Sequence, residues 1–374
     1  MAGLYLHIPF CKQACHYCDF HFSTDTRTVQ ELLSAMQREM ELRRDFLPSP
    51  PETVYLGGGT PSLIPGKALH ELLKTVRNCF PVFPGQEVTL EANPDDLSEE
   101  KLATFREAGI NRLSIGIQSF RDDILNYMNR AHGASMARAC LQKSRAAGFA
   151  NLSIDLIYAI PGLDMGGWKE TLTEAVSNKP EHISLYALTI EERTVFGNRQ
   201  KKGTLYAVDD DEAARQFELM QEVLGAAGYE QYEISNFAQP GFHSRHNSSY
   251  WFQKPYLGIG PSAHSYDGNR RMINVRNNAA YITSLAAERL PAETEWLTSE
   301  NKINEFILTR LRTKWGCDLR TLRESLNDNL MTRCGDVVGK YVEQGLLRVH
   351  DDTLFLTQKG KLLADRITEE LIVG

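Results

Sequence analysis

The alternation of short strands and helices over the first half of the chain restricts its fold more than any other feature. Six β-rich runs are each followed by a helical stretch, and they lie at residues 4–10, 53–56, 87–94, 112–117, 151–158 and 182–188. Chains with this order of elements form βαβ units, so we expect the strands to run parallel in one sheet. We interpret the strands as apolar on both faces, which is typical of parallel strands buried on both sides.

Residues of unusual type lie at or near the C-terminal ends of five of these strands. They are Cys11, Gly58, Glu91, Gln118 and Asp155. A doubly wound sheet and an open barrel both fit the order of elements, but barrel enzymes build their sites on this rim. We therefore predict an α/β fold whose main part is a partial (β/α)6 barrel.

The second half of the chain divides at two changes of composition. Residues 229–294 are harder to read: the run from Tyr229 to Ile234 predicts a strand, and glycines and prolines interrupt the pattern after it. Residues 295–374 contain three helical stretches, a hairpin around Asp351-Asp352 and a last helix, an order typical of a winged-helix module. We predict a barrel over residues 1–228, an extension of the barrel over 229–294, and a C-terminal α+β winged-helix-like domain over 295–374.

Charge and hydropathy argue against several classes of protein. The 374 residues include 41 basic and 48 acidic ones, for a net charge of −7. A nucleic-acid binder typically has a basic patch, so we expect no nucleic-acid partner and assign the C-terminal module to packing or docking. The N-terminus lacks the pattern of a signal peptide, and no apolar run approaches the roughly 20 residues of a membrane span. We predict a cytoplasmic protein.

Three of the seven cysteines lie within eight residues, spaced C-x3-C-x2-C, directly after the first strand. Cys11, Cys15 and Cys18 are suited to three corners of a [4Fe–4S] cluster, whose fourth iron would stay open for a small molecule. A zinc site completed by His16 or His21 is the alternative, because structural zinc takes four ligands. The spacing alone leaves both readings open.

A glycine run follows the second strand directly. Gly57-Gly58-Gly59-Thr60-Pro61 lacks the Lys-Ser/Thr of a P-loop and the spacing of a dinucleotide fingerprint. Glycines allow the backbone to approach a ligand closely and to adopt positive φ. The run therefore indicates a ligand-binding turn of unspecified kind.

Together these stretches resemble a known superfamily. Tyr5-x-His7-x-Pro9-x-Cys11-x3-Cys15-x2-Cys18, followed by the glycine run, resembles the radical S-adenosylmethionine (SAM) proteins. Three later motifs resemble the branch that contains the oxygen-independent coproporphyrinogen III oxidase and the HemW-type heme chaperones. These motifs are Glu91-Ala92-Asn93-Pro94, the run from Ser114 to Phe120, and His246-Asn247-x2-Tyr250-Trp251. The resemblance covers essentially the whole chain.

The resemblance implies a radical SAM barrel with a [4Fe–4S] cluster on Cys11, Cys15 and Cys18, and with SAM chelated to the open iron. It thereby favours the cluster over zinc. Positions that contact SAM in the branch, some of them a second SAM molecule, match Tyr5, Tyr17, Gly58, Gly59, Thr60, Glu91, Gln118, Arg130 and Asp155. Residue type alone leaves a structural role open for both carboxylates: Asp155 could bond neighbouring backbone amides, and Glu91 could pair with Arg112 or another cation.

Two departures distinguish the chain from the oxidase. The oxidase has a further cysteine two positions after the third, where this chain has Phe20, and it has an extension before its first strand. Both departures match the heme chaperones. The resemblance therefore implies a heme chaperone that passes heme to acceptor proteins, with decarboxylation of coproporphyrinogen III as the alternative. It leaves open whether the chain is an enzyme, and we assign no catalytic residue.

His246 is where heme enters this interpretation. Imidazole is a common axial ligand of heme iron, and Tyr250 and Trp251 offer flat faces for a porphyrin. Residue type alone favours a histidine that packs on these rings, whereas the resemblance implies a heme ligand. His264 is a second candidate. The resemblance also implies respiratory membrane enzymes as acceptors, hence a transient association with the membrane, and a homodimer.

Overall fold

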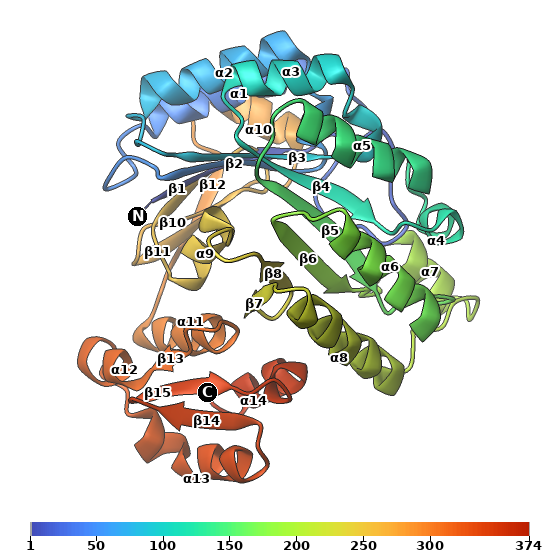
Figure 1. Cartoon of the computed structure of the whole chain (residues 1–374). Helices are drawn as coiled ribbons and strands as arrows, with labels where there is room; N and C mark the ends of the chain where they lie inside the picture. The colour runs from blue at the N-terminus through green and yellow to red at the C-terminus, as the bar shows by residue number, and fades with distance from the viewer. Residues whose placement is uncertain (1, 374) are drawn as a thin grey trace.

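The structure is a computed structural model that describes residues 2–373, and its main part is an open barrel (Figure 1). Six strands pair in parallel in the order in which they occur along the chain. They are β1 (Gly3–Ile8), β2 (Thr53–Gly58), β3 (Glu87–Ala92), β4 (Arg112–Gln118), β5 (Leu152–Tyr158) and β6 (His182–Ala187). The predicted partial (β/α)6 barrel is confirmed.

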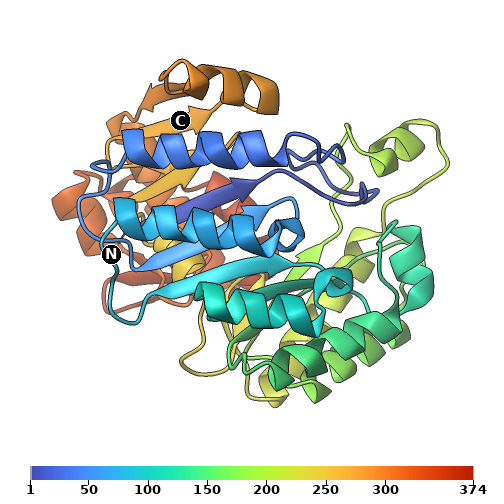
Figure 2. The ribbon, with the colours of Figure 1, turned by 90° about the horizontal axis from the view of Figure 1, so that it is seen from above.

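Helices cover the outside of the curved sheet, as Figures 1 and 2 show. They are α1 (Val29–Leu42), α2 (Gly66–Cys79), α3 (Glu99–Ala108), α4 (Asp122–Tyr127), α5 (Ala134–Ala146), α6 (Met165–Ser177) and α8 (Asp210–Ala226). The short helix α7 (Val195–Lys201) instead lies beside the loop after β1, where Phe196 N donates to the His16 carbonyl at 3.0 Å. Local sequence sets their ends. Ser98 accepts a hydrogen bond from the amide of Lys101 and begins α3, and Gly109 ends it in the left-handed region at φ 97°.

The two faces of the barrel strands differ in chemistry, so the prediction of strands apolar on both faces is wrong. Leu4, Leu6 and Ile8 of β1 are fully buried in the core beneath the helices, whereas Tyr5 and His7 alternate with them and line a cavity. The other strands alternate in the same way. A polar inner face is stable here because inner side chains bond one another, and it leaves the barrel interior free to bind polar ligands.

Further strands extend the sheet at both edges to twelve strands. On the β1 side lie β9 (Tyr256–Ile259), β10 (His264–Tyr266), β11 (Arg270–Asn274) and β12 (Ala292–Trp296); on the β6 side lie β8 (Asn236–Ala238) and β7 (Glu230–Glu233). Between these segments are α9 (Arg245–Trp251) and α10 (Asn278–Ala286). The strand predicted at residues 229–234 is confirmed as β7. The other elements gave no regular pattern in the sequence because most are only three to five residues long. Helix α9, expected as a loop, begins at Ser244, which accepts a hydrogen bond from the Asn247 amide.

The C-terminal module has a hydrophobic core of its own. It contains α11 (Ser299–Leu311), β13 (Cys317–Asp318), α12 (Leu319–Ser325), α13 (Leu330–Glu343), β14 (Leu347–His350), β15 (Thr353–Leu356), the 3-10 turn η3 (Gly360–Leu363) and α14 (Ala364–Glu369). The β14–β15 hairpin pairs with β13 in a small antiparallel sheet, which confirms the winged-helix-like class. The domain boundaries at 228/229 and 294/295 stay predictions.

None of the helices within residues 2–373 combines the length and the apolar character that a membrane crossing would require.

Candidate functional site

The three clustered cysteines lie on the loop that leaves the C-terminal end of β1, and all three are free and half-buried. Two of them accept hydrogen bonds. The Thr60 hydroxyl donates to Cys11 Sγ at 3.4 Å, and the Arg130 guanidinium donates to Cys15 Sγ at 3.3 Å. Such donors favour the thiolate form, which is the form that binds iron.

Burial opposes deprotonation in the metal-free loop. It raises the pKa of Cys11, and it raises the pKa of Cys18 to about 11. Thiols of this kind release protons when they bind metal, so the affinity of the site for metal rises with pH.

The three thiols do not converge on one point. Within residues 2–373, no group of three or more His, Cys, Asp or Glu side chains is arranged to hold a single metal ion. A [4Fe–4S] cluster instead takes its thiolates at separate corners of a cube. The donor set therefore suits a cluster with three protein ligands better than one zinc ion.

The glycine run packs the end of β2 against the start of the cysteine loop. Gly59 N donates to the Ile8 carbonyl at 2.8 Å, and Thr60 N donates to the Phe10 carbonyl at 2.7 Å. A Cβ on Gly59 would lie 2.7 Å from the Phe10 oxygen, and Gly58 has φ 111° with His7 against it. The glycines thus allow two strand ends to approach each other, and this approach places Thr60 beside Cys11.

Arg130 connects the cysteine loop to the ends of β3 and β4. It donates to Cys15 Sγ and the Tyr17 hydroxyl, both at 3.3 Å, to Asn93 Oδ1 at 2.6 Å and to the Gly116 carbonyl at 2.8 Å. Both terminal nitrogens are thereby engaged, while the buried Nε has no partner among the described residues. This orphaned donor fits a polar group of a bound molecule.

Two carboxylates lie on the inner face of the barrel. Glu91 accepts hydrogen bonds from the Tyr55 hydroxyl at 2.8 Å and from Gly58 N at 3.0 Å, and Asp155 accepts a long one of 3.5 Å from Ser114. Burial raises the pKa of Glu91 to about 7 and the pKa of Asp155 to about 6. Both carboxylates would gain from a cation or hydroxyl donor beside them.

Gln118 is the last residue of β4, and the pairing of β4 with β5 shifts register just before it. Its φ of 63° lies in the left-handed region, where a non-glycine residue costs energy. Strain of this kind is often found at binding sites, so it is consistent with the predicted SAM contact.

His246 lies at the N-terminal ends of β1 and β2, away from the cysteine loop and the glycine run. It packs against Gly3 and Thr53, the first residues of β1 and β2, whereas Gly58 is the last residue of β2. At about 3.3 Å per residue along a strand, the two ends are roughly 16 Å apart.

Both ring nitrogens of His246 are in use. Nδ1 is bonded to the Thr53 hydroxyl at 2.7 Å and Nε2 to the Tyr250 hydroxyl at 2.8 Å, and the residue is only 1% exposed. Burial lowers the pKa of His246 to about 3, so the imidazole is neutral. Ligation of heme iron would require it to give up one of these bonds, and its role as a ligand stays a prediction.

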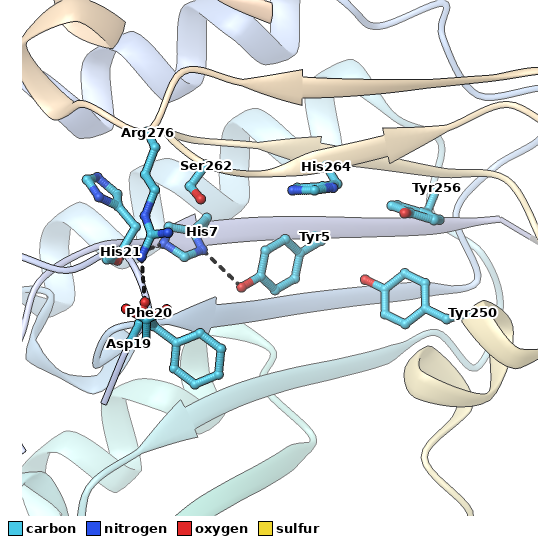
Figure 3. A pocket seen from close by; sticks show the side chains of 10 residues that line it. All are labelled: Tyr5, His7, Asp19, Phe20, His21, Tyr250, Tyr256, Ser262, His264 and Arg276. Atoms are coloured by element: carbon cyan, nitrogen blue, oxygen red, sulfur yellow. Dashed lines mark hydrogen bonds between the residues drawn. The ribbon is translucent and has the colours of Figure 1, made fainter. Parts of the chain in front are cut away.

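Beside the cysteine loop is a cavity of about 520 Å³ at the β1 side of the barrel (Figure 3). It is lined by Tyr5, His7, Asp19, Phe20, His21, Tyr250, Tyr256, Ser262, His264 and Arg276. Tyr5 is the one predicted SAM-contact residue that lines it. The second heme candidate His264 and the heme-motif residue Tyr250 also line it. Trp251 instead faces the C-terminal module, where the Arg312 guanidinium lies over its ring.

Sequence reasoning missed most of this lining. Asp19 and His21 flank Phe20, which drew attention only as a substitution for cysteine. Tyr256, Ser262 and Arg276 come from a segment without regular pattern. A signal was nevertheless present, since three histidines lie in or next to the motifs already singled out.

Known proteins are similar to this chain over both of its parts. The profile of the radical SAM superfamily matches residues 5–175, and that of the HemN C-terminal domain matches residues 297–363. The heme chaperone HemW of Bacillus subtilis is 36% identical over 98% of each chain. The heme chaperone HemW of Mycobacterium tuberculosis is 38% identical over 99% of this chain and 94% of its own.

A solved structure, coproporphyrinogen III oxidase (HemN) from Escherichia coli, described as a radical SAM enzyme, has the same fold. It aligns with a TM-score of 0.86 over 100% of this chain and 90% of its own, at 21% identity. The fold, the arrangement of the cysteine loop and the near full-length identity to the chaperones agree. The chain belongs to the HemW heme-chaperone family of the radical SAM superfamily.

Proposed function

We propose that this protein is a heme chaperone that binds a [4Fe–4S] cluster and SAM, holds heme and transfers it to acceptor proteins. The observation that carries the proposal is the adjacency of two sites. Residues 19–21 follow Cys18 directly and form one wall of the 520 Å³ cavity, so the thiol loop and the cavity share a segment. Its volume lies within the range of about 300–1,000 Å³ that is usual for ligand pockets.

Cys11, Cys15 and Cys18 would hold the cluster, which when bound would supply an open iron for the amino and carboxylate groups of SAM. Thr60 and Arg130 hold two of the thiolates by hydrogen bonds. Arg130 also fixes Tyr17 against the loop.

The inner face of the barrel would hold the remainder of SAM. Glu91 and Asp155 are suited to hydroxyl or ammonium groups, and Gln118 and Tyr5 belong to two other strands of the same barrel, β4 and β1. Gly58 and Gly59 contribute indirectly, because they let the strand ends approach each other.

Heme is the cargo in this proposal. We infer that His246 supports heme binding through Tyr250, whose hydroxyl it contacts and whose ring lines the cavity. The curated relatives are heme chaperones by name, which supports heme as cargo. We further propose respiratory proteins as acceptors, a cytoplasmic location with transient membrane association, and a homodimer.

Oxidative decarboxylation of coproporphyrinogen III is the alternative, favoured by the shared architecture with the E. coli oxidase. Phe20 argues against it. Where the oxidase has a further cysteine, this chain presents an exposed phenyl ring at the cavity, 73% accessible. A phenyl ring provides an apolar contact for a porphyrin but neither a proton nor an electron.

The deciding experiment measures two properties of one anaerobically reconstituted sample. Titration with hemin should give a saturable Soret band, and incubation with coproporphyrinogen III, SAM and a reductant should give no protoporphyrinogen. Turnover of coproporphyrinogen would contradict the chaperone assignment, and so would the absence of saturable hemin binding.

A further inference from the structure

Four histidines lie in or beneath the cavity, but their ring nitrogens differ in availability. His7 is bonded through Nδ1 to the Tyr5 hydroxyl and through Nε2 to the His21 carbonyl, both at 3.1 Å. His21 uses Nε2 on Asn278 at 2.8 Å, and both nitrogens of His246 are occupied. Among residues 2–373, His264 is the member of this group whose ring makes no hydrogen bond at all.

His264 is also the best placed of the four for a large ligand. It projects from β10 and lines the cavity with an exposed ring, while Tyr5 projects from β1 (Figure 3). Burial and the nearby Arg271 cation lower the pKa of His264 below its usual value. The ring is therefore neutral at pH 7, the form in which imidazole binds a metal.

The turn that carries His264 is held by a buried carboxylate. Glu39, fully buried in α1, accepts hydrogen bonds from Gly260 N at 2.9 Å and from Asn274 Nδ2 at 2.8 Å, and it is paired with Arg43 at 3.1 Å. On the other side, the His264 carbonyl oxygen lies only 2.1 Å from the position that a Cβ on Gly258 would take, so the two backbones are in close contact. The backbone of His264 is thus fixed from two sides, as a ligand position requires.

Arg276 supplies a cation at the same cavity. One of its nitrogens donates to the Asp19 carbonyl, and the guanidinium has no carboxylate partner among the described residues. The Asp19 carboxylate, exposed at the mouth, is the one acid in the lining. Arginine pairs with carboxylates in a fork geometry, and the propionates of a tetrapyrrole are carboxylates.

We propose that His264 ligates the iron of heme bound in this cavity and that Arg276 pairs with a heme propionate, while Tyr5, Tyr250 and Phe20 provide aromatic faces for the macrocycle. The assignment rests on the proposed function, since it specifies how the cargo is held. It makes His246 a positioning residue that acts through Tyr250.

The test compares His264→Ala, His246→Ala and Arg276→Ala with His350→Ala in the full-length, cluster-reconstituted protein. His350 is an exposed histidine on β14 and serves as the matched control. Hemin binding is followed by the Soret band, and metal-free protoporphyrin IX binding by quenching of porphyrin fluorescence. Protoporphyrin carries the propionates but no iron, so it reports on the cavity without the iron bond.

His264→Ala should shift the Soret band and weaken hemin binding by about tenfold, while protoporphyrin binding stays as in wild type. Added imidazole should restore the wild-type spectrum. Arg276→Ala should weaken the binding of both hemin and protoporphyrin without shifting the Soret band. His246→Ala should weaken the binding of both ligands and leave the Soret band at its wild-type position. His350→Ala should change the binding of neither ligand.

Two results would overturn the assignment and separate it from the proposed function. If wild type binds hemin but His264→Ala keeps its spectrum and affinity, His264 is not the ligand and the chaperone proposal stands. If His246→Ala alone loses the ligand spectrum and recovers it with imidazole, His246 is the ligand. A wild-type protein that binds no hemin would remove both proposals.

Discussion

At the scale of single residues, two half-buried carboxylates and one arginine set the electrostatics of the barrel interior. Burial raises the pKa of Glu91 to about 7 and that of Asp155 to about 6. Arg130 is engaged at both terminal nitrogens by protein groups, including Cys15. The interior therefore favours a cationic or hydroxyl-bearing ligand near the carboxylates, which agrees with the proposed position of SAM.

Glu91 should make the stability of the ligand-free protein depend on pH. Its pKa is higher in the folded state than its ordinary value of 4.5, so the folded state binds the proton more tightly. This contribution is fully present below about pH 4.5 and is lost as pH rises through about 7, with a magnitude of at most about 3 kcal/mol. Thermal melts of wild type and Glu91→Gln from pH 5 to 8 should show the wild type losing stability relative to the variant.

The Glu91→Gln variant is the reference for the wild type, because it keeps every other titrating group, including Asp155. A difference in melting temperature that stays constant across this pH range would show that Glu91 keeps an ordinary pKa.

At the scale of elements, the ends of the strands determine where the ligands lie. The glycine turn after β2 packs directly on the segment Ile8–Phe10 that leads to Cys11. The β9–β10 turn is similarly anchored by Glu39 of α1. At the first place a close backbone approach positions Cys11, and at the second a buried side chain holds the turn that leads to His264.

Gly59→Ala should disturb the cysteine loop. The new Cβ would lie 2.7 to 2.9 Å from backbone atoms of Phe10 and Ile8, which cannot move aside without shifting Cys11. We expect the free energy of unfolding to fall by about 1–3 kcal/mol, as is usual for such overpacking, and the melting temperature to fall with it. We also expect less iron and sulfide after reconstitution, measured together with absorbance near ~400 nm.

Gly225→Ala is the matched control, because a Cβ at this position of α8 meets no atom within 4 Å. Alanine there should leave the cluster content unchanged and keep or slightly raise stability, by up to about 1 kcal/mol. Equal cluster content in the Gly59 and Gly225 variants would contradict the role given to the glycine turn.

At the scale of the whole molecule, two hydrophobic cores are joined by a polar and aromatic contact. Arg312, just after α11, pairs with Glu233 of β7 at 3.3 Å and with Asp365 at 2.8 Å. Arg310 of the same module stacks on Phe252 at 4.5 Å. Since α9 lies just before Phe252, the C-terminal module contacts the segment that carries His246 and Tyr250.

Arg312→Ala should loosen this contact. Glu233 is only 2% exposed, so removing Arg312 leaves a buried carboxylate whose remaining hydrogen bonds come from Ser235 and Asn236, at a cost of about 1–3 kcal/mol. Hydrogen exchange should increase in β7, β8 and α11, and the melting temperature should fall. Arg366→Ala removes an exposed arginine of the same module and should change neither quantity. Unchanged exchange in the Arg312 variant would show that the aromatic contacts, together with the backbone hydrogen bonds of Ile234 N to the Arg312 carbonyl and of Lys314 N to the Tyr232 carbonyl, hold the modules together without this ion pair.

The sequence by itself determined the parallel barrel and the C-terminal class, and it singled out the three clustered cysteines, because these depend on local periodicity and on motifs of short span. Pattern reasoning was wrong about the inner faces of the strands, since it counted apolar residues without separating the alternate positions such as Tyr5 and His7. Strands β9 to β12 and helix α9 were missed because they are short. The strands are stabilised by pairing rather than by local preference: β9 pairs with β1, and β10, β11 and β12 follow it outward in the sheet.

Only the tertiary structure decided which histidine is free to bind a ligand. His246 was singled out by its motif, yet folding places it in the barrel floor with both ring nitrogens bonded. His264 is about as far along the chain from the cysteines as His246 is, but β-pairing brings it to the wall of the cavity beside the cysteine loop. Hydrogen-bond occupancy and exposure arise from contacts between distant segments, and no local pattern encodes them.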